Sequence, residues 1–594
     1  MFLLRRLLAR RRAVVLATAL LLTALTAPVT PSLPIGAALA AEAPVAATAA
    51  AESGASRTFH VSTNGSDAAQ GTAAAPLRTI SEAVDRATSG DRILVHDGSY
   101  HESVLVPQGL DVAISAAPGA HPWLEGSRRV SGWRRSGGQF VHPGWRVEFD
   151  ASPTYTWGAP DNDAPGWSFV NPRHPMAAHP DQVWIDGRAQ QQVSSRRQVG
   201  PGRFFVDYDT HRLYLGSDPR GRTVRASDIA KALGVQGAGT SISGLGVRRF
   251  APSVPHMGAV TVEAPGVHLD HMAVRDNATT GLHVTATDAV LNHVRLERNG
   301  MLGLSATYAD HLRLLRVVSR RNNTEHFNQA PVAGGAKVGR TRGVEVRDSD
   351  FSDNDGTGLW FDESTYDLSV VRSAMRDNRG HGLSVEISAV ARIVGDVVAG
   401  NHRDGIKVND TSDVAIWNNT VVGNGRPLDI VQDDRDATGP ATPGHDPRQP
   451  APDPTMPWLD GPVQVHDNVL GRVRSSANCL LCVEDYSGRF SADDLHVTSS
   501  GNVYQRVRRD HPTWAVVWSR GYGDPYVFDS VDEFSRSTGQ EQPHLELVGE
   551  PAVDLDLRVT PRVQDQASYV AEPLPAELAT LVGRSSGERH LGAW

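Results

Sequence analysis

The chain has 594 residues, of which 40% are hydrophobic and 21% are charged, and its formal net charge is −9 at pH 7. This composition excludes a wholly disordered chain and a collagen, and the acidic balance argues against nucleic acid as the main partner, because phosphate binding needs a basic surface. The 56 glycines suit an all-β chain with many tight turns.

The first 40 residues have the features of an export signal. Five arginines precede an apolar run at 13–25 that is too short to span a membrane, and Ala38-Leu39-Ala40 forms a cleavage site. Residues 41–56 are rich in alanine and predict a loose linker. No later stretch of about 20 apolar residues exists. We therefore expect an extracellular protein, secreted through a signal peptide, with no membrane span.

Residues 57–125 predict the first coils of a β-helix, and residues 126–225 interrupt them. The apolar spacing at 79–87 predicts a short helix that caps the open end of the first coil, which would otherwise expose an unpaired edge. Within the interruption, the segments 182–187 and 204–215 have the pattern of antiparallel strands joined by a turn. We predict that this interruption is an inserted β-sandwich.

An asparagine recurs through the middle of the chain and is followed shortly by a glycine and an aliphatic residue. The recurring residues are Asn277, Asn299, Asn322, Asn354, Asn378, Asn401 and Asn424. Their spacings are 22, 23, 32, 24, 23 and 23 residues, so one coil carries an insertion near 325–334. This period predicts a right-handed parallel β-helix over 226–510, with terminal coils and a docked tail in 511–594. We expect the asparagines to be structural, with amides hydrogen-bonded from coil to coil.

Aligning the coils by their glycines places side chains in two columns. Two positions after each glycine stand His283, Ser305, Lys337, Trp360, Ser384 and Lys407. Four positions after each glycine stand Thr285, Thr307, Gly339, Asp362, Glu386 and Asn409. Between the columns lie the apolar residues Val284, Ala306, Val338, Phe361, Val385 and Val408. Strand alternation therefore points the apolar residues into the core and both columns toward solvent.

Asp362 and Glu386 occupy one column on neighbouring coils, and adjacent strands lie about 4.8 Å apart. Retaining glycosidases hold two carboxyl groups about 5 to 5.5 Å apart. Like charges this close raise the pKa of one group, so that one carboxyl stays protonated as an acid while the other is an ionised nucleophile. We predict Asp362 and Glu386 as the catalytic pair, with a calcium site or a solvated acidic face as alternatives.

Other polar side chains of the columns are predicted to bind the substrate. Two of the chain's three lysines, Lys337 and Lys407, flank the carboxylates, where they would bind substrate, tune pKa values or merely offset the acidic charge. Trp360 is expected to point outward and stack on a sugar ring, with packing under a loop as the alternative. Asn409 continues the carboxylate column and is assigned to substrate binding as well.

Segments outside the columns complete the prediction. The coil insertion carries Glu325 and His326, which are expected to close over the carboxylates, with His326 as a substrate-binding residue. Residues 436–457 are rich in proline and aspartate and predict a long loop. The only cysteines, Cys479 and Cys482, predict a local disulfide in an exported protein.

The layout resembles known families of carbohydrate-active proteins. The stretch from 59 to 102, with T-I-x-x-A at 79–83, G-D at 90–91 and G-x-Y at 98–100, resembles the opening of secreted right-handed β-helix proteins that act on carbohydrates. The export signal, the interrupted β-helix and an Asp with a Glu one coil later resemble glycoside hydrolase family 120, the β-xylosidases. The resemblance implies a retaining hydrolase of plant or cell-wall glycans, with Asp362 as nucleophile and Glu386 as acid/base.

Two other functions stay open at this stage. A polysaccharide lyase on the same fold would use Lys337 or Lys407 as its base. Its Ca²⁺ would be held by Asp362, Glu386 and Asp410. A non-catalytic polysaccharide binder would need only the polar and aromatic face. The hydrolase needs no cofactor or metal, whereas Ca²⁺ belongs to the lyase alternative, and all three functions have a carbohydrate partner.

Overall fold

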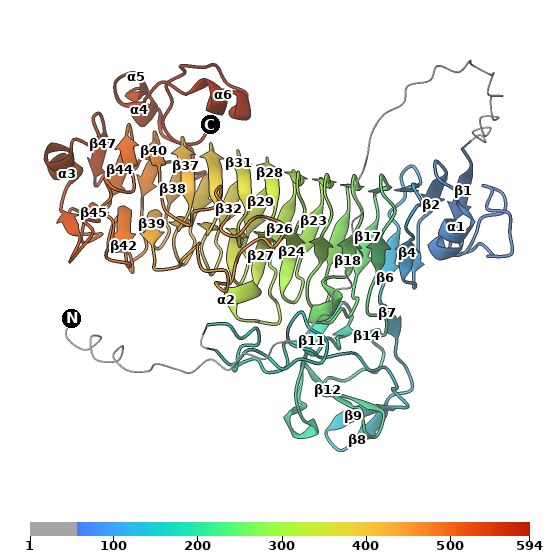
Figure 1. Ribbon diagram of the computed structural model, residues 1–594. Helices are drawn as coiled ribbons and strands as arrows, with labels where there is room; N and C mark the ends of the chain where they lie inside the picture. The colour runs from blue at the N-terminus through green and yellow to red at the C-terminus, as the bar shows by residue number, and fades with distance from the viewer. Residues whose placement is uncertain (1–55, 165) are drawn as a thin grey trace, which may run out of the picture. The chain divides into compact units, whose positions relative to one another are not determined.

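The computed structural model describes residues 56–164 and 166–594, so the predicted export signal and the linker up to residue 55 lie outside the described residues. The described chain is a right-handed parallel β-helix, as the repeat predicts (Figure 1). Three sheets of 13 strands run along the coils. Sheet 1 extends from β1 (Thr58–Val61) to β43 (Val497–Ser500), and sheet 3 extends from β3 (Ser99–Tyr100) to β47 (Leu545–Val548). Their inward side chains form one continuous apolar core.

Sheet 2 is the sheet that carries both columns. Its strands pair in parallel except for the last two, which are antiparallel. In order they are β4 (Val104–Val106), β15 (Leu233–Val235), β18 (Val260–Val262), β21 (Leu282–Val284), β24 (Leu302–Thr307), β27 (Gly334–Gly339), β30 (Thr357–Asp362), β33 (Leu383–Glu386), β36 (Ile406–Asn409), β39 (Leu428–Gln432), β42 (Leu481–Asp485), β45 (Val516–Trp518) and β46 (Tyr526–Phe528).

The recurring asparagines form a ladder at the turn that leads from sheet 3 into sheet 2. The side-chain Nδ2 of Asn354 donates to Oδ1 of Asn378 at 3.0 Å, and Asn378 donates to Asn401 in the same way. The same Oδ1 atoms also accept the backbone N–H of the preceding asparagine. The bonds extend without interruption from Asn277 to Asn424. The structural role predicted for these residues is confirmed.

Helices close the two ends of the core. At the first coil, α1 (Ile80–Arg86) begins at Thr79, whose side chain accepts the backbone N–H of Glu82, and it buries Ile80, Ala83 and Val84. This helix occupies the place that the sequence predicts for a cap. At the other end, α3 (Val531–Thr538) packs Phe534 against Trp518, with ring centroids 4.9 Å apart.

The C-terminal tail covers part of the outer faces of sheets 1 and 3. It contains α4 (Pro561–Gln564), α5 (Ala567–Val570) and α6 (Ala576–Val582). Helix α6 packs on apolar residues of sheet 1 such as Val394 and Trp417, and α5 packs on residues of sheet 3 such as Val503.

The insertion between the first coils and the main helix is a sheet of eight strands, most of them antiparallel. Their order is β7 (Ser127–Arg129), β14 (Val224–Ser227), β10 (Val183–Ile185), β11 (Arg188–Gln192), β12 (Arg203–Asp207), β13 (Arg212–Leu215), β9 (Gln139–Pro143) and β8 (Arg134–Ser136). Both halves of this order share one apolar core, which includes Ile185, Phe204 and Leu213. The sheet therefore curls over on itself as a sandwich with hydrogen-bonded continuity between its layers.

The segment between β9 and β10 returns to the coils. Asn328, in the coil insertion, donates from its side chain to the backbone carbonyl of Ser168 at 2.9 Å, and its backbone N–H donates to Phe169 at 2.8 Å. Short helix α2 (Gln329–Val332) follows directly. Farther along, Cys479 and Cys482 form a disulfide. Within residues 56–164 and 166–594, no helix is both long and apolar enough to cross a membrane.

Candidate active site

The columns of sheet 2 have the register that the sequence predicts. Parallel pairing places His283, Ser305, Lys337, Trp360, Ser384 and Lys407 side by side on successive strands. The intervening residues Val338, Phe361, Val385 and Val408 are fully buried in the core. One expectation is wrong: His283, Ser305 and Ser384 point away from the core but are buried. Alternation decides which side of a sheet a residue faces, but the segments that pack on that side decide whether the residue is exposed to solvent.

The predicted catalytic residues line one cavity of about 450 Å³ on the outer face of sheet 2. Its floor includes Lys337, Trp360, Asp362, Ser384, Glu386 and Lys407. Its walls come from outside the columns: Trp167 from the insertion, Gln329 and Pro331 from the coil insertion, and Arg435, Thr442 and Gly444 from the loop after β39. The volume lies within the range of about 300 to 1,000 Å³ that is typical of ligand sites.

Asp362 ends strand β30 and is held by two donors. The Lys337 ammonium lies 2.8 Å from Oδ2, and the backbone N–H of Glu363 donates to Oδ1 at 2.7 Å. Lys337 also donates to the Pro331 carbonyl at 2.7 Å and lies 4.0 Å from the centre of the Trp360 ring. Burial by itself lowers the pKa of Lys337, but the carboxylates of Asp362 and Glu363 raise it above its usual value. Lys337 is therefore a stable cation placed against the Asp362 carboxyl group.

Glu386 ends strand β33 and shares Trp360 with the Asp362 side of the cavity. The Trp360 indole Nε1 donates to Oε2 of Glu386 at 3.2 Å, and the Arg435 guanidinium lies 2.8 Å from Oε1. The same guanidinium contacts Asp410 at 2.8 Å and Asp433 at 3.0 Å. Burial lowers the pKa of Arg435, but its three carboxylate neighbours raise it overall. Trp360 thus connects the two carboxylates: its ring contacts Lys337, which is paired with Asp362, and its N–H donates to Glu386.

This arrangement bears on the calcium alternative. Arg435 lies between Glu386 and Asp410, two of the three ligands that the alternative requires, and contacts both at 2.8 Å. In the part of the chain that the structure describes, the one group of His, Cys, Asp and Glu side chains close enough to share a metal ion is Asp270, His271 and His293, which do not line this cavity. The residues around Glu386 therefore fit an internal ion-pair network better than a calcium cage.

The other predicted binding residues have different positions. Lys407 lines the cavity and donates to Oδ1 of Asn409 at 2.8 Å. Asn409 itself is buried and donates to the Val431 carbonyl, so it orients Lys407 from behind rather than facing a substrate. His326 does not close over the carboxylates. It lies in a neighbouring cleft, with Nδ1 2.6 Å from Asp355 and its ring centroid 4.4 Å from that of His174.

Several cavity residues were absent from the sequence prediction. Arg435 is the most consequential, because it contacts Glu386 directly; the only sequence signal was its position beside a long loop rich in proline and aspartate. Trp167 lines the cavity from the insertion and is 47% exposed, which leaves a ring face open for stacking. His381 lines it too, with Nδ1 3.0 Å from Asp404. The coil period marks neither Arg435 nor Trp167; it contains His381, directly before the repeat glycine Gly382, but gives no sign that His381 faces the cavity.

Comparisons with known proteins establish the fold. A family model for a right-handed beta helix region matches residues 258–424, and no curated protein matches the sequence. A solved structure of XylC in complex with xylose is similar with a TM-score of 0.62 and 13% identity, over 83% of this chain and 86% of that one. A structure described as a glycoside hydrolase has a TM-score of 0.46 and 11% identity, over 64% and 96%. Pectate lyase Pel9A has a TM-score of 0.34 and 12% identity, over 71% and 76%.

Proposed function

We propose that this protein is a carbohydrate-active enzyme, specifically a retaining glycoside hydrolase that favours β-xyloside-type substrates of plant or cell-wall glycans. One observation carries the proposal: Asp362 and Glu386 directly follow paired residues of the neighbouring strands β30 and β33, and both line one cavity. Trp360 lies between them, because its N–H donates to Glu386 and its ring contacts Lys337, the partner of Asp362. The similarity to the fold of XylC, which was solved with xylose, supports the choice of sugar. We also propose that residues 1–40 export the protein, so that it acts outside the cell.

In the first step, Asp362 attacks the anomeric carbon of the sugar while Glu386 gives a proton to the departing oxygen. Asp362 suits the nucleophile because the Lys337 ammonium and the Glu363 N–H contact its carboxyl group and fix its orientation, while its remaining lone pairs stay free. In the second step, Glu386 takes a proton from water, the water attacks the anomeric carbon, and Asp362 is released.

Arg435 and Trp360 position the acid/base. Arg435 keeps Asp410 and Asp433 as partners when Glu386 turns toward the leaving group, so its charge is never left buried and unpaired. Trp360 donates to Glu386 at 3.2 Å and limits how far its carboxyl group can rotate. Lys407 and Trp167 line the cavity around the sugar, where the first can bond hydroxyl groups and the second can stack on a ring face.

The lyase alternative is weaker because of Lys337. A catalytic base must be neutral to accept a proton, whereas Lys337 is held as a cation by Asp362 and Glu363. Its three contacts, with Asp362, Pro331 and Trp360, all suit an ammonium group.

A panel of aryl glycosides and uronate polymers, assayed with and without a chelator, tests the proposal. We expect release of the aryl group from a β-xyloside, unaffected by chelator, with the anomeric configuration of the first product retained by NMR. Absorbance from unsaturated uronates would instead establish a lyase. No activity on any substrate of the panel, together with binding to a polysaccharide, would establish a non-catalytic binder.

A further inference from the structure

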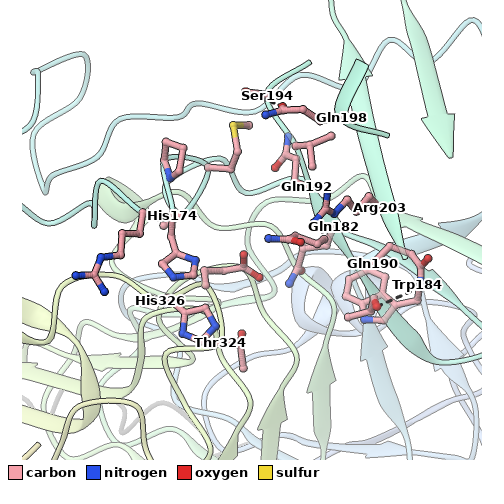
Figure 2. A pocket seen from close by; sticks show the side chains of 18 of the residues that line it. His174, Gln182, Trp184, Gln190, Gln192, Ser194, Gln198, Arg203, Thr324 and His326 are labelled. Carbon is pink, nitrogen blue, oxygen red and sulfur yellow. Dashed lines mark hydrogen bonds between the residues drawn. The ribbon is translucent and has the colours of Figure 1, made fainter. Parts of the chain in front are cut away.

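A second cavity, of about 630 Å³, lies between the inserted sheet and the coil insertion. Figure 2 shows Gln182, Trp184, Gln190, Gln192 and Arg203 on one side of it and the paired rings of His174 and His326 on the other. We call this cavity the glutamine cleft. Neither Asp362 nor Glu386 lines it.

The lining of the glutamine cleft is unusually rich in neutral amides. Five glutamines contribute to it: Gln182, Gln190, Gln191, Gln192 and Gln198. Each carboxamide offers two donors and one acceptor oxygen without a net charge, and this combination matches the hydroxyl groups of a neutral sugar. The cleft also contains charges: Arg298 is paired with Asp276 at 2.8 Å, while Arg173 and Arg203 line the cleft as well. The indole of Trp184 supplies an apolar surface beside the amides.

Gln192 gives an independent sign that the cleft binds a ligand. Its side chain is only 8% exposed, and its Nε2 donates to Asp181. Its Oε1 is buried and has no hydrogen-bond partner among the described residues. An unmet buried acceptor costs about 1 to 3 kcal/mol, so a donor from outside the chain, such as a sugar hydroxyl, would stabilise this side chain.

Glu325 lies on the opposite wall and is half-buried. Its carboxyl group lines the cleft and has no hydrogen bond or ion pair with the residues that the structure describes. Burial raises the pKa of Glu325 to about 7. In its protonated form this carboxyl both donates and accepts, as do the hydroxyl groups of a sugar.

The glutamine cleft adjoins the carboxylate cavity through a shared partition. Asp355 lies 2.6 Å from Nδ1 of His326, a wall of the cleft, and accepts a hydrogen bond of 3.2 Å from Gln329, a wall of the carboxylate cavity. The insertion segment before β10 also lines both, through Trp167 on one side and His174 on the other. The two cavities are therefore neighbours on either side of this partition.

We propose that the glutamine cleft is a second glycan-binding site, which holds a neutral stretch of oligosaccharide next to the carboxylate cavity. The ligand class rests on the proposed function, whereas the site itself rests on the unmet amide oxygen of Gln192 and on the lining of the cleft. The enzyme would then act on chains of several sugars rather than on isolated disaccharides.

Calorimetric titration of the full chain carrying Asp362→Asn, which prevents turnover, tests this inference. The probes are xylohexaose, cellohexaose, mannohexaose and trigalacturonate. Ala189 lines the cleft and is exposed, so Ala189→Trp would fill the cleft without disturbing a core. Arg188 is equally exposed, does not line the cleft and lies on the alternate face of β11, so Arg188→Trp is the matched control. Gln192→Leu tests the unmet amide separately.

We expect at least one neutral hexaose to bind, its affinity to fall about tenfold or more with Ala189→Trp and with Gln192→Leu, and to change less than about twofold with Arg188→Trp. Failure of all neutral hexaoses to bind, binding of trigalacturonate alone, or equal affinity in all variants would overturn the inference. Turnover of an aryl xyloside by the unmodified chain separates the two proposals. If Ala189→Trp weakens hexaose binding but the unmodified chain does not turn over the aryl xyloside, the hydrolase proposal is wrong and the second binding site is supported.

Discussion

Two ladders of stacked side chains run along the same coils, and they follow opposite rules. The asparagine ladder repeats one residue, and each amide is satisfied by the next, as Asn354 is by Asn378 at 3.0 Å. The column of sheet 2 changes residue at every coil, from Lys337 to Trp360 to Ser384. Identical amides satisfy one another, whereas unlike neighbours in a column need partners from elsewhere.

Those partners come from segments outside the coils and form the walls of the carboxylate cavity. Pro331 from the coil insertion accepts from Lys337, and Arg435 from the loop after β39 contacts Glu386. The asparagine ladder is complete within the coils, and its members are almost fully buried. In this protein, the coil position that repeats the same residue stabilises the fold. The coil position whose residue varies contacts loops from outside the coils, and these loops form the walls of the cavity.

The largest expected effect comes from breaking the varied column at Asp362. We expect Asp362→Asn to lower kcat at least about 1,000-fold for every leaving group, because the nucleophile is lost while the shape is kept. Asp367→Asn is the matched control, since this aspartate is exposed on the adjacent strand β31 (Tyr366–Val371) and changes no contact of the site. Steady-state rates on a series of aryl glycosides measure both. Near-normal rates in Asp362→Asn would exclude it as the nucleophile.

Glu386 should give a smaller effect that depends on the leaving group. Glu386→Ala should lower turnover by about 100-fold or more for poor leaving groups, which need a proton, and much less for good ones. Added azide should restore part of the rate by attacking the glycosyl-enzyme in place of activated water. A uniform loss for all leaving groups, with no response to azide, would remove Glu386 from the acid/base role.

The repeated ladder predicts an effect on stability instead. In Asn354→Ala, the backbone N–H and side chain of Asn322 lose their acceptor, and the two bonds donated by the Asn354 side chain disappear. We expect the free energy of unfolding to fall by about 3 kcal/mol, because these groups are buried. Asn64→Ala, at an exposed turn, should change it by less than about 0.5 kcal/mol. Chemical denaturation measures both, and equal effects would show that the ladder adds nothing.

The period of the chain made the coils, the register and the ladder predictable. A repeat of 22 to 24 residues fixes which positions stack, so Lys337, Trp360 and Lys407 could be aligned from the sequence alone. Alternation then gave their side of the sheet, and Phe361 and Val385 are in the core as expected.

The loops could not be predicted in this way because they have no period. His326 lies within the one coil insertion, where counting from the glycines no longer indicates a direction, and it faces the glutamine cleft instead of the carboxylates. Arg435 and Trp167 reach the cavity from segments that are distant in the sequence. His283 and Ser305 point outward by alternation but are buried. The local sequence determines the side of the sheet that a residue faces, whereas its burial depends on segments that are distant in the sequence.

The smallest effect we predict concerns Asp410, a buried carboxyl that belongs to neither ladder and stabilises Arg435 from behind. Burial, with the hydrogen bond to Asp433, raises the pKa of Asp410 to about 7, although Arg435 opposes the shift. The folded chain therefore keeps this proton up to about pH 7, whereas the unfolded chain releases it near its ordinary pKa of about 3.9. Between these two pKa values the folded chain binds more protons than the unfolded chain. The free energy of unfolding should therefore fall as the pH rises from about 4 to 7. In Asp410→Asn that part of the fall, about 2.5 kcal/mol between pH 5 and pH 8, should vanish, because an amide does not titrate. Denaturation at pH 5 and pH 8 measures the difference, with Asp367→Asn as the exposed control that should keep the wild-type slope. An unchanged slope in Asp410→Asn would mean that Arg435 holds this carboxyl ionised throughout, and that the Glu386 end of the cavity carries one more negative charge than we infer.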